Sequence, residues 1–327
     1  MKLPAAFDPA VYRTLHADLS ALSDAELVNH YNLYGKTEGR IGNALADRNA
    51  FAALIGPELN ALEIGPIHAP MLKGPNARFC DVLDQAELKQ RAIEEGLPTE
   101  RVPTIHFKVG SGFLDEIRVQ FDAIFSSHSI EHQPDLIRHL QQIERRLTDT
   151  GRYFAIIPDQ RYCFDREFSP STIADVLQAH HEGRTRHSLQ SVIEHRALRV
   201  HNDPVTHWKL RDRQPPHQPA DAVISAAVQE FVTSGGAYID VHAWFFTPDS
   251  FSQLLTLLRQ LKKTNLQIER LYRTRLNANE FWVVLKKGEV IVPASDLATA
   301  ERERPFSLLE TERLSNALVA EQAKRSS

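Results

Sequence analysis

Short apolar runs alternate with amphipathic stretches from residue 59 onward, and this alternation limits the fold more than any other feature of the chain. The apolar runs predict strands over residues 61–64, 77–83, 121–126 and 152–157, with a final pair over 266–272 and 281–285. Asp84, Pro134 and Thr247 each stand where a stretch with helical spacing begins. Such alternation predicts an α/β fold, a doubly wound and mostly parallel sheet with helices on both faces.

The alternation stops between residues 160 and 237, in a stretch rich in His, Arg, Gln and Pro. We therefore predict one α/β domain over residues 46–288 that carries 160–237 as a large insertion after the strand at 152–157. Residues 1–45 form a separate helical module in this interpretation, with one helix over 9–19 and a second that Ser23 and Glu26 start as a capping box. Residues 289–327 are expected to be a charged tail.

Composition and charge exclude several classes of function. The formal net charge of −4 offers no basic field that would attract nucleic acid. Cys80 and Cys163 lie far apart without a C-x-x-C motif, which indicates a reducing compartment. No apolar run reaches the roughly 18 residues of a membrane span, and the first residues lack the apolar core of a secretory signal. We expect a cytoplasmic protein.

Two residues at predicted strand ends, Gly65 and Asp81, indicate the kind of cofactor. Gly65 ends the first strand, where glycine permits a tight turn and a close approach of backbone to ligand. Asp81 lies near the end of the second strand, where a carboxylate can accept both hydroxyls of a ribose. No G-x-G-x-x-G follows the first strand, so the glycines that a pyrophosphate needs are missing. Ribose recognition without phosphate recognition points to S-adenosylmethionine.

Three segments of the chain resemble the class I S-adenosylmethionine-dependent methyltransferases. They are E-I-G-P at 63–66, F-C-D-V-L-D at 79–84 and S-H-S-I-E-H at 127–132. The segments R-Y-C-F-D at 161–165 and D-V-H-A-W at 240–244 often accompany E-I-G-P in one subgroup of that family. The resemblance implies a Rossmann-like sheet of the class I methyltransferase type, with a cofactor site lined by Glu63, Gly65, Pro66, Asp81, Ser127 and His128.

The N-terminal region resembles a short module found on bacterial glycosyltransferases and other surface-polysaccharide proteins. The resemblance rests on its closing pattern, Y-x-x-x-G-x-x-E-G-R, which runs from Tyr31 to Arg40. It implies that the acceptor is a sugar in a surface glycan or its precursor, and that other glycan-assembly enzymes are partners. Methylation of a small molecule unrelated to glycans, and a non-catalytic methyltransferase-like scaffold, are the alternatives.

Transfer of a methyl group to a hydroxyl needs a base, and His is suited to that task because its ordinary pKa is about 6.5. We expect His242 to be the base, ahead of His132, with Asp240 orienting it on a strand over 238–246. The full set of catalytic candidates is His242, His132, Asp159 and Asp240. The candidates for acceptor binding are Arg161, Tyr162, Asp165, Arg184, Arg186 and Trp244.

A metal ion is not expected from the sequence. Many of the fifteen His residues fall within the insertion or close to it. Their spacings match no common ligand pattern such as H-E-x-x-H. We therefore interpret the His residues at 180, 181, 187, 195, 201 and 207 as surface side chains, and we expect methyl transfer without a metal.

Overall fold

The computed structural model describes residues 2–110, 112–209 and 220–288. The charged tail expected at 289–327 and the Pro-rich break at 215–219 lie outside the described residues. Within the described part of the chain, no helix is both long and apolar enough to cross a membrane.

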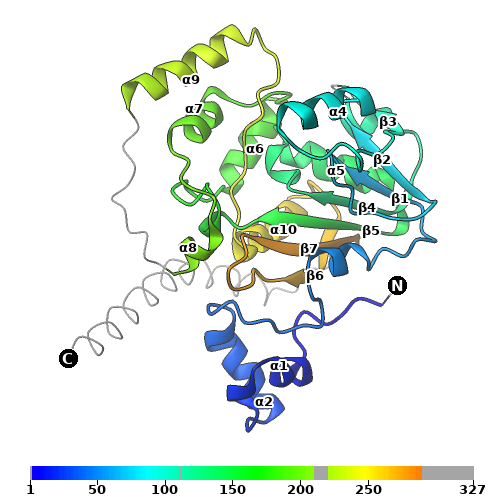
Figure 1. The fold of residues 1–327 in the computed structure, drawn as a ribbon, viewed down its shortest axis with the longest axis vertical. Coiled ribbons are helices and arrows are strands. Elements are labelled where there is room, and N and C mark those ends of the chain that lie inside the picture. The colour runs from blue at the N-terminus through cyan, green and yellow to red at the C-terminus, as the bar shows by residue number, and fades with distance from the viewer. Residues whose placement is uncertain (1, 111, 210–219, 289–327) are drawn as a thin grey trace.

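A seven-stranded sheet forms the centre of the α/β domain, in the order β3-β2-β1-β4-β5-β7-β6 (Figure 1). All neighbouring pairs are parallel except those that β7 makes with β5 and β6. The chain order reverses between β1 and β4, which is where open α/β sheets bind ligands. The predicted doubly wound fold class is confirmed. The strands are β1 (Ala61–Ile64), β2 (Ala77–Asp81), β3 (Phe107–Lys108), β4 (Phe121–Ser127), β5 (Leu147–Pro158), β6 (Leu266–Tyr272) and β7 (Glu280–Lys287).

Two apolar cores explain why the strands read as nearly continuous apolar runs. Leu62 and Ile64 face one core, which α5 (Leu136–Arg146) and α10 (Pro248–Gln260) cover. Phe154 and Ile156 face the other core, where α3 (Arg48–Ala52) contributes Phe51. A sheet that is buried on both faces needs apolar side chains in both directions. The remaining elements of this domain are α4 (Gln85–Glu94) and the short 3₁₀ turns η3 (Phe113–Glu116), η4 (Ile130–His132) and η5 (Gln160–Tyr162).

Two of the three predicted helix starts are confirmed by their caps, whereas α5 begins at Leu136 with Asp135 as its cap and not at Pro134. Asp84 and Glu87 form a capping box at α4, and Thr247 caps α10 with Pro248 in the first turn. The strand β5 starts earlier than its prediction, at Leu147. Its pairing with β4 is irregular between Phe121 and Ala123, and residues 148–151 belong to this irregular part of the strand.

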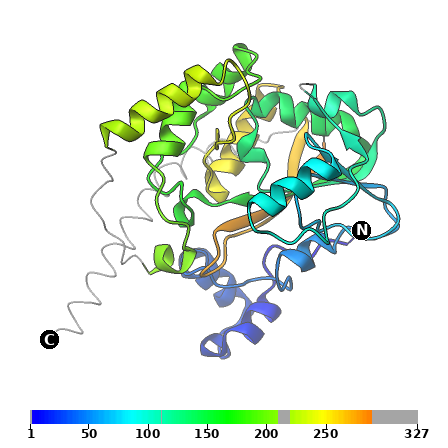
Figure 2. The same cartoon turned by 45° about the horizontal axis from the view of Figure 1, so that its top comes forward.

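The insertion contributes α6 (Ile173–His181), α7 (Leu189–Ala197), α8 (Pro204–Trp208) and α9 (Asp221–Thr233). Helices α7 and α9 lie side by side in both views (Figures 1 and 2) and share a small apolar cluster that includes Val192 and Ala227.

The strand predicted over 238–246 is wrong: the segment is extended, but only Phe246 forms a bridge, with Asp159. Its backbone N–H groups donate to groups that are not part of a neighbouring strand. Those of Ala243 and Trp244 donate to the carbonyl of Glu131, and that of Phe245 donates to the Ser171 hydroxyl. The segment is therefore attached to η4 and to the insertion instead of to the sheet.

The N-terminal helices form a unit of their own beside β6 and β7 (Figure 1). They are α1 (Pro9–Leu15), η1 (Ala17–Leu19), α2 (Asp24–His30) and a π-helical turn over Tyr31–Gly35. The single helix predicted over 9–19 is interrupted at His16, which has a non-helical backbone. Tyr12, Leu27 and Tyr31 are buried in a separate cluster. The capping box of Ser23 and Glu26 is confirmed.

Candidate active site

The turn after β1 has the geometry that a ligand-binding glycine requires. Gly65 has a φ of 65°, in the left-handed region that side chains disfavour. No heavy atom lies within 4 Å of the position that a Cβ on Gly65 would take. Open space therefore lies beside the backbone at the carboxyl end of the central strand. Pro66, the next residue, is buried and fixes the direction of the chain after the turn.

Glu63 organises the loop that follows this turn. Its carboxylate, 3% exposed, accepts the backbone N–H of Met71 at 3.0 Å and that of Leu72 at 2.8 Å. Burial raises the pKa of this carboxyl to about 7, although the two backbone hydrogen bonds act in the opposite direction. The carboxylate of Glu63 therefore shapes the loop between Gly65 and Leu72.

Asp81 closes β2, the strand next to β1. Its side chain is nearly buried and accepts the N–H of Leu83 at 3.0 Å. Burial raises the pKa of its carboxyl, and hydrogen bonds from the Leu83 and Val82 backbone oppose that shift. Since β1 and β2 are parallel neighbours, Gly65 and Asp81 lie at the same edge of the sheet.

His128, directly after β4, is held by residues that sequence reasoning missed. It has a φ of 49°, which few non-glycine residues adopt. Its Nε2 lies 2.9 Å from the Glu280 carboxylate at the start of β7, and the Arg48 guanidinium donates to the same carboxylate. Ser127 ends β4 and is half-buried. Glu280 and Arg48 lie far from His128 in the chain, so no local sequence pattern indicates these contacts.

The Glu280 ion pairs predict a measurable pH dependence of stability. Burial raises the pKa of the Glu280 carboxyl, but hydrogen bonds from His128 and Arg48 outweigh it and hold the pKa at about 2. A carboxyl with a lowered pKa in the folded state stabilises the protein above its unfolded pKa, and this contribution is lost as the pH falls toward 2. Urea unfolding at pH 6 and at pH 3 should therefore show a smaller loss of stability for Glu280→Gln than for wild type. An equal loss in both proteins would contradict the assignment.

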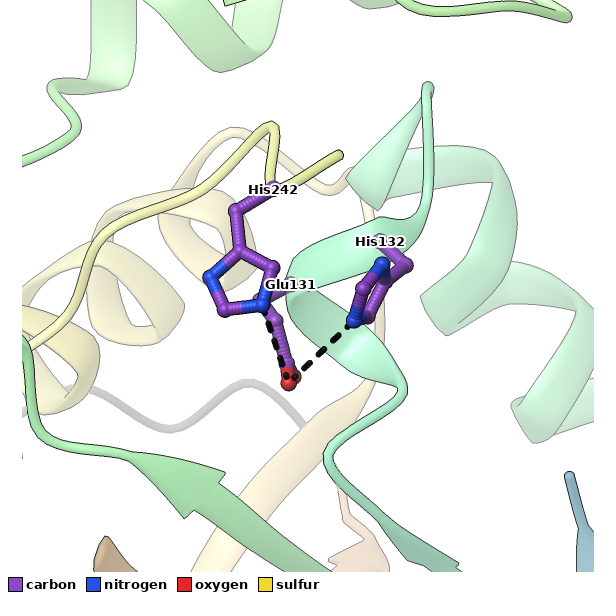
Figure 3. Close-up of side chains that lie close together, drawn as sticks. All are labelled: Glu131, His132 and His242. Atoms are coloured by element: carbon purple, nitrogen blue, oxygen red, sulfur yellow. Dashed lines mark ion pairs between the residues drawn. The ribbon is translucent and has the colours of Figure 1, made fainter. Parts of the chain in front are cut away.

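A cluster of imidazoles and carboxylates lies close to His128, and its members come from η4 and the 238–246 segment. The Nε2 atoms of His132 and His242 both face the Glu131 carboxylate, at 3.8 and 3.9 Å (Figure 3). The two rings are T-shaped with centroids 4.5 Å apart. Glu131 and His242 are buried, whereas His132 is partly exposed.

Each of the two imidazoles is oriented by a carboxylate at its other nitrogen. The Nδ1 of His242 lies 2.6 Å from Asp165, which is buried, and the Nδ1 of His132 lies 2.9 Å from Asp240. The sequence led us to expect Asp240 as the partner of His242. The structure pairs Asp240 with His132 instead, because the irregular segment does not alternate as a strand does. Asp165, expected in acceptor binding, is the residue that orients His242.

Trp244 fixes the segment that carries His242. It is 2% exposed, packs in the core below η4 and donates its indole N–H to the carbonyl of Gln133 at 2.5 Å. Together with the backbone bonds to Glu131, this contact sets the distance between His242 and η4. Trp244 is not among the residues that line the cavity described below, and its role in acceptor binding stays a prediction.

A cavity of about 320 Å³ opens beside the imidazoles. The sheet side provides His128, and the insertion provides Phe164, His195, Arg199 and Asn202 among others. Arg199 thus provides a guanidinium group on the cavity wall, and it was not among the residues predicted from the sequence. Arg184 pairs with Glu182, and Arg186 lies over the Phe231 ring; neither lines the cavity.

The remaining candidates have structural partners. Arg161 donates to both oxygens of the buried Asp159, at 2.9 and 2.7 Å, and the Thr274 hydroxyl donates to the same carboxylate at 2.5 Å. These hydrogen bonds give Asp159 and Arg161 a structural role, and the role of Asp159 as a base stays a prediction. Tyr162 is buried and stacks on Trp208 with ring centroids 3.9 Å apart.

Several of the other His residues are not at the surface as the sequence led us to expect. His187, His195 and His207 are buried, and burial lowers the pKa of His187 to about 3. His180 lies 3.0 Å from Asp135. Among the described residues, the one set of three His, Cys or acidic side chains close enough to share a metal ion is Glu131, His132 and His242.

Comparisons with known proteins give distant structural similarities only. No family model matches the chain, and no curated protein matches it. The mitomycin 7-O-methyltransferase MmcR aligns at 12% identity and a TM-score of 0.35 over 83% of this chain and 60% of its own. An S-adenosylmethionine-dependent methyltransferase from Clostridium acetobutylicum aligns at 11% identity and a TM-score of 0.38, over 81% of this chain and 99% of its own. A protein from Rhodobacter sphaeroides named as a Zn-dependent alcohol dehydrogenase aligns at 13% identity and a TM-score of 0.40, over 80% of this chain and 97% of its own.

These similarities are too low to assign an activity, and the matched proteins do not share one. The chain spans less than two thirds of the length of MmcR. The fold class is established by the order and directions of the strands, and the chemistry has to be inferred from the site.

Proposed function

We propose that this protein is an S-adenosylmethionine-dependent methyltransferase that methylates a hydroxyl group. The observation that carries the proposal is the pair formed by Gly65 and Asp81 at adjacent strand ends. Gly65 leaves room for a ligand beside the backbone, and Asp81 presents a carboxylate suited to a ribose. The loop after Gly65 continues with Pro66 and lacks the glycines that hold a pyrophosphate, which favours a nucleoside cofactor without phosphates.

The residues of this chain have separable tasks in the proposed reaction. S-adenosylmethionine supplies the methyl group on a sulfonium that is a good leaving group, so the protein mainly has to align acceptor and methyl. Asp81 holds the ribose hydroxyls, and Glu63 holds the loop that surrounds the rest of the cofactor. The insertion provides much of the wall of the cavity that receives the acceptor. The acceptor hydroxyl lies in the cavity and loses its proton at the cluster formed by His132, His242 and Glu131.

Replacement of Asp81 by alanine tests the cofactor site. We expect Asp81→Ala to weaken binding of S-adenosylmethionine by about 1–3 kcal/mol, the usual cost when hydrogen-bonded partners lose one member. Titration calorimetry measures the difference. Asp84→Ala is the matched control, because Asp84 lies three residues away and is occupied with capping α4. Equal affinity of Asp81→Ala and wild type would remove Asp81 from the site.

For the acceptor, we propose a sugar of a bacterial surface glycan or its precursor. The resemblance of the N-terminal module to those of surface-polysaccharide proteins supports this class, and the polar cavity wall with Arg199 and Asn202 is compatible with it. Glycan-assembly enzymes are the corresponding partners, and the cytoplasm the corresponding compartment. A small-molecule acceptor remains the second candidate, because a cavity of about 320 Å³ is large enough for one.

A methyl-transfer assay decides between these acceptors. The intact chain is incubated with S-adenosylmethionine labelled in its methyl group and offered nucleotide sugars, surface oligosaccharides or a panel of phenolic compounds. We expect label on the sugars and none on the phenols. Label on the phenols alone identifies a small-molecule methyltransferase. A chain that binds the cofactor but labels neither set supports the non-catalytic scaffold.

A further inference from the structure

Three side chains at the cavity have the composition of a transition-metal site. Glu131, His132 and His242 each direct one ligand atom to a common point, and these atoms all lie within 4.8 Å of one another (Figure 3). Metal–ligand bonds of roughly 2.0–2.2 Å place neighbouring ligand atoms about 3–3.5 Å apart. The Glu131–imidazole distances of 3.8 and 3.9 Å are slightly longer, and small rotations of the two imidazoles close the set.

The surroundings of the two imidazoles strengthen this reading. A His that binds a metal through one nitrogen almost always has its other N–H directed to a carboxylate, a carbonyl or water. Here Asp165 is the hydrogen-bond partner of the His242 Nδ1, and Asp240 lies 2.9 Å from the Nδ1 of His132 as an ion-pair contact. Each carboxylate holds its imidazole so that Nε2 faces the third ligand.

The burial of Glu131 is a second indication of a bound ion, independent of the arrangement of the two imidazoles. Its side chain is 0% exposed, and neither carboxylate oxygen has a hydrogen-bond partner. Burial of a carboxylate without hydrogen bonds or a close counter-charge is strongly unfavourable. The nearest ionisable groups are imidazoles at 3.8 Å or more from the carboxylate, too far for hydrogen bonds. A divalent cation among these groups removes the penalty.

We propose that Glu131, His132 and His242 bind one divalent transition-metal ion, for which Zn²⁺ is the reference probe. Two imidazoles and one carboxylate suit zinc and related first-row ions, whereas Mg²⁺ favours oxygen ligands and water. The remaining coordination positions face the cavity, because His132 and His242 line its wall. This site revises the metal-free mechanism expected from the sequence.

The role of the ion in catalysis rests on the proposed function, whereas its binding does not. The acceptor oxygen coordinates the ion, which lowers the pKa of the hydroxyl. The proton leaves to water, and a lone pair of the oxygen forms the new bond to the methyl carbon. The bond between that carbon and sulfur breaks, and its electron pair stays on sulfur. The products are a methyl ether and the neutral thioether form of the cofactor.

Metal uptake is measured on the intact chain after treatment with chelator and dialysis. We expect one equivalent of Zn²⁺ to bind in calorimetry, and Co²⁺ to give the visible absorption of an ion with imidazole ligands. His242→Ala and the isosteric Glu131→Gln should lose tight binding. Asp165→Asn, which changes an orienting residue only, should weaken it by roughly 10–100-fold. His181→Ala is the matched control, since His181 is exposed and outside the cluster.

The outcomes separate the metal site from the methyltransferase. Binding of less than one equivalent by wild type, or undiminished binding by both Glu131→Gln and His242→Ala, overturns the site. Circular dichroism of Glu131→Gln shows whether a loss of binding comes from unfolding; a folded variant that binds no ion supports the site. Metal binding without methyl transfer leaves the site standing while the proposed function fails. Full methyl transfer by chelated protein overturns the catalytic role of the ion alone.

Discussion

Replacement of His242 by alanine should lower the turnover of methyl transfer by about 10²–10⁴-fold, the contribution usual for groups that handle a proton in the transition state. His242 stands where the insertion rejoins the core, with Nδ1 held by Asp165 and Nε2 facing Glu131. Its loss breaks up the cluster of Glu131, His132 and His242 at which the acceptor hydroxyl loses its proton. Gly65 and Asp81 are untouched, so the affinity for S-adenosylmethionine should remain.

Turnover at saturating cofactor and the cofactor dissociation constant are the two quantities to measure. Asp165→Asn provides an intermediate case, because it keeps the imidazole but replaces the carboxylate that orients it. We expect a smaller loss of turnover for Asp165→Asn than for His242→Ala, and wild-type turnover for His181→Ala. If His242→Ala retains near-normal turnover, the cluster is not the place where the acceptor proton is lost.

Asp159→Ala should reduce the free energy of unfolding by about 2–4 kcal/mol, the largest stability effect that we expect from a single site candidate. Asp159 is 0% exposed, and its removal leaves the Arg161 guanidinium and the Thr274 hydroxyl without their acceptor. Arg161 is partly exposed and regains some hydration, so the loss stays below that of a fully buried ion pair.

Urea unfolding measures the free energy of unfolding of Asp159→Ala, with Asp149→Ala as the control. Asp149 lies on the same strand but is fully exposed, so its variant should unfold at the wild-type midpoint. At a temperature where Asp159→Ala is folded, its turnover should be within a few-fold of wild type. A stable Asp159→Ala protein without turnover would return this residue to the list of catalytic groups.

The fold was predictable because its signals are local. Strands with two buried faces give apolar runs such as that of β1, and the starts of α4 and α10 have capping residues within three or four positions. These features depend on neighbours in the sequence. The short β3 has only two residues, and no periodicity can indicate so short a strand.

The site was predicted less completely because its contacts join distant residues. His242 was singled out by its position, but its partner Asp165 is 77 positions away in the chain. Glu280 holds His128 across 152 positions. Glu131 was passed over although it stands between two named motif residues, since nothing in the sequence indicates that its carboxylate is buried without hydrogen bonds.

The segment over 238–246 differs from its prediction for a physical reason. Its apolar residues alternate well enough to suggest a strand, and that pattern placed Asp240 and His242 on one face. In the fold, the backbone bonds of Ala243 and Trp244 to Glu131 twist the segment away from the sheet. Each His is thereby oriented by a different carboxylate.

Titration calorimetry of the purified wild-type chain with S-adenosylmethionine tests the central claim most directly. Its demethylated product and NAD⁺, as a dinucleotide control, are titrated alongside. We expect saturable binding of S-adenosylmethionine and of its product, with one site per chain. We expect no binding of NAD⁺, because the turn after β1 lacks the pyrophosphate-binding glycines. Binding of NAD⁺ without binding of S-adenosylmethionine would contradict the account.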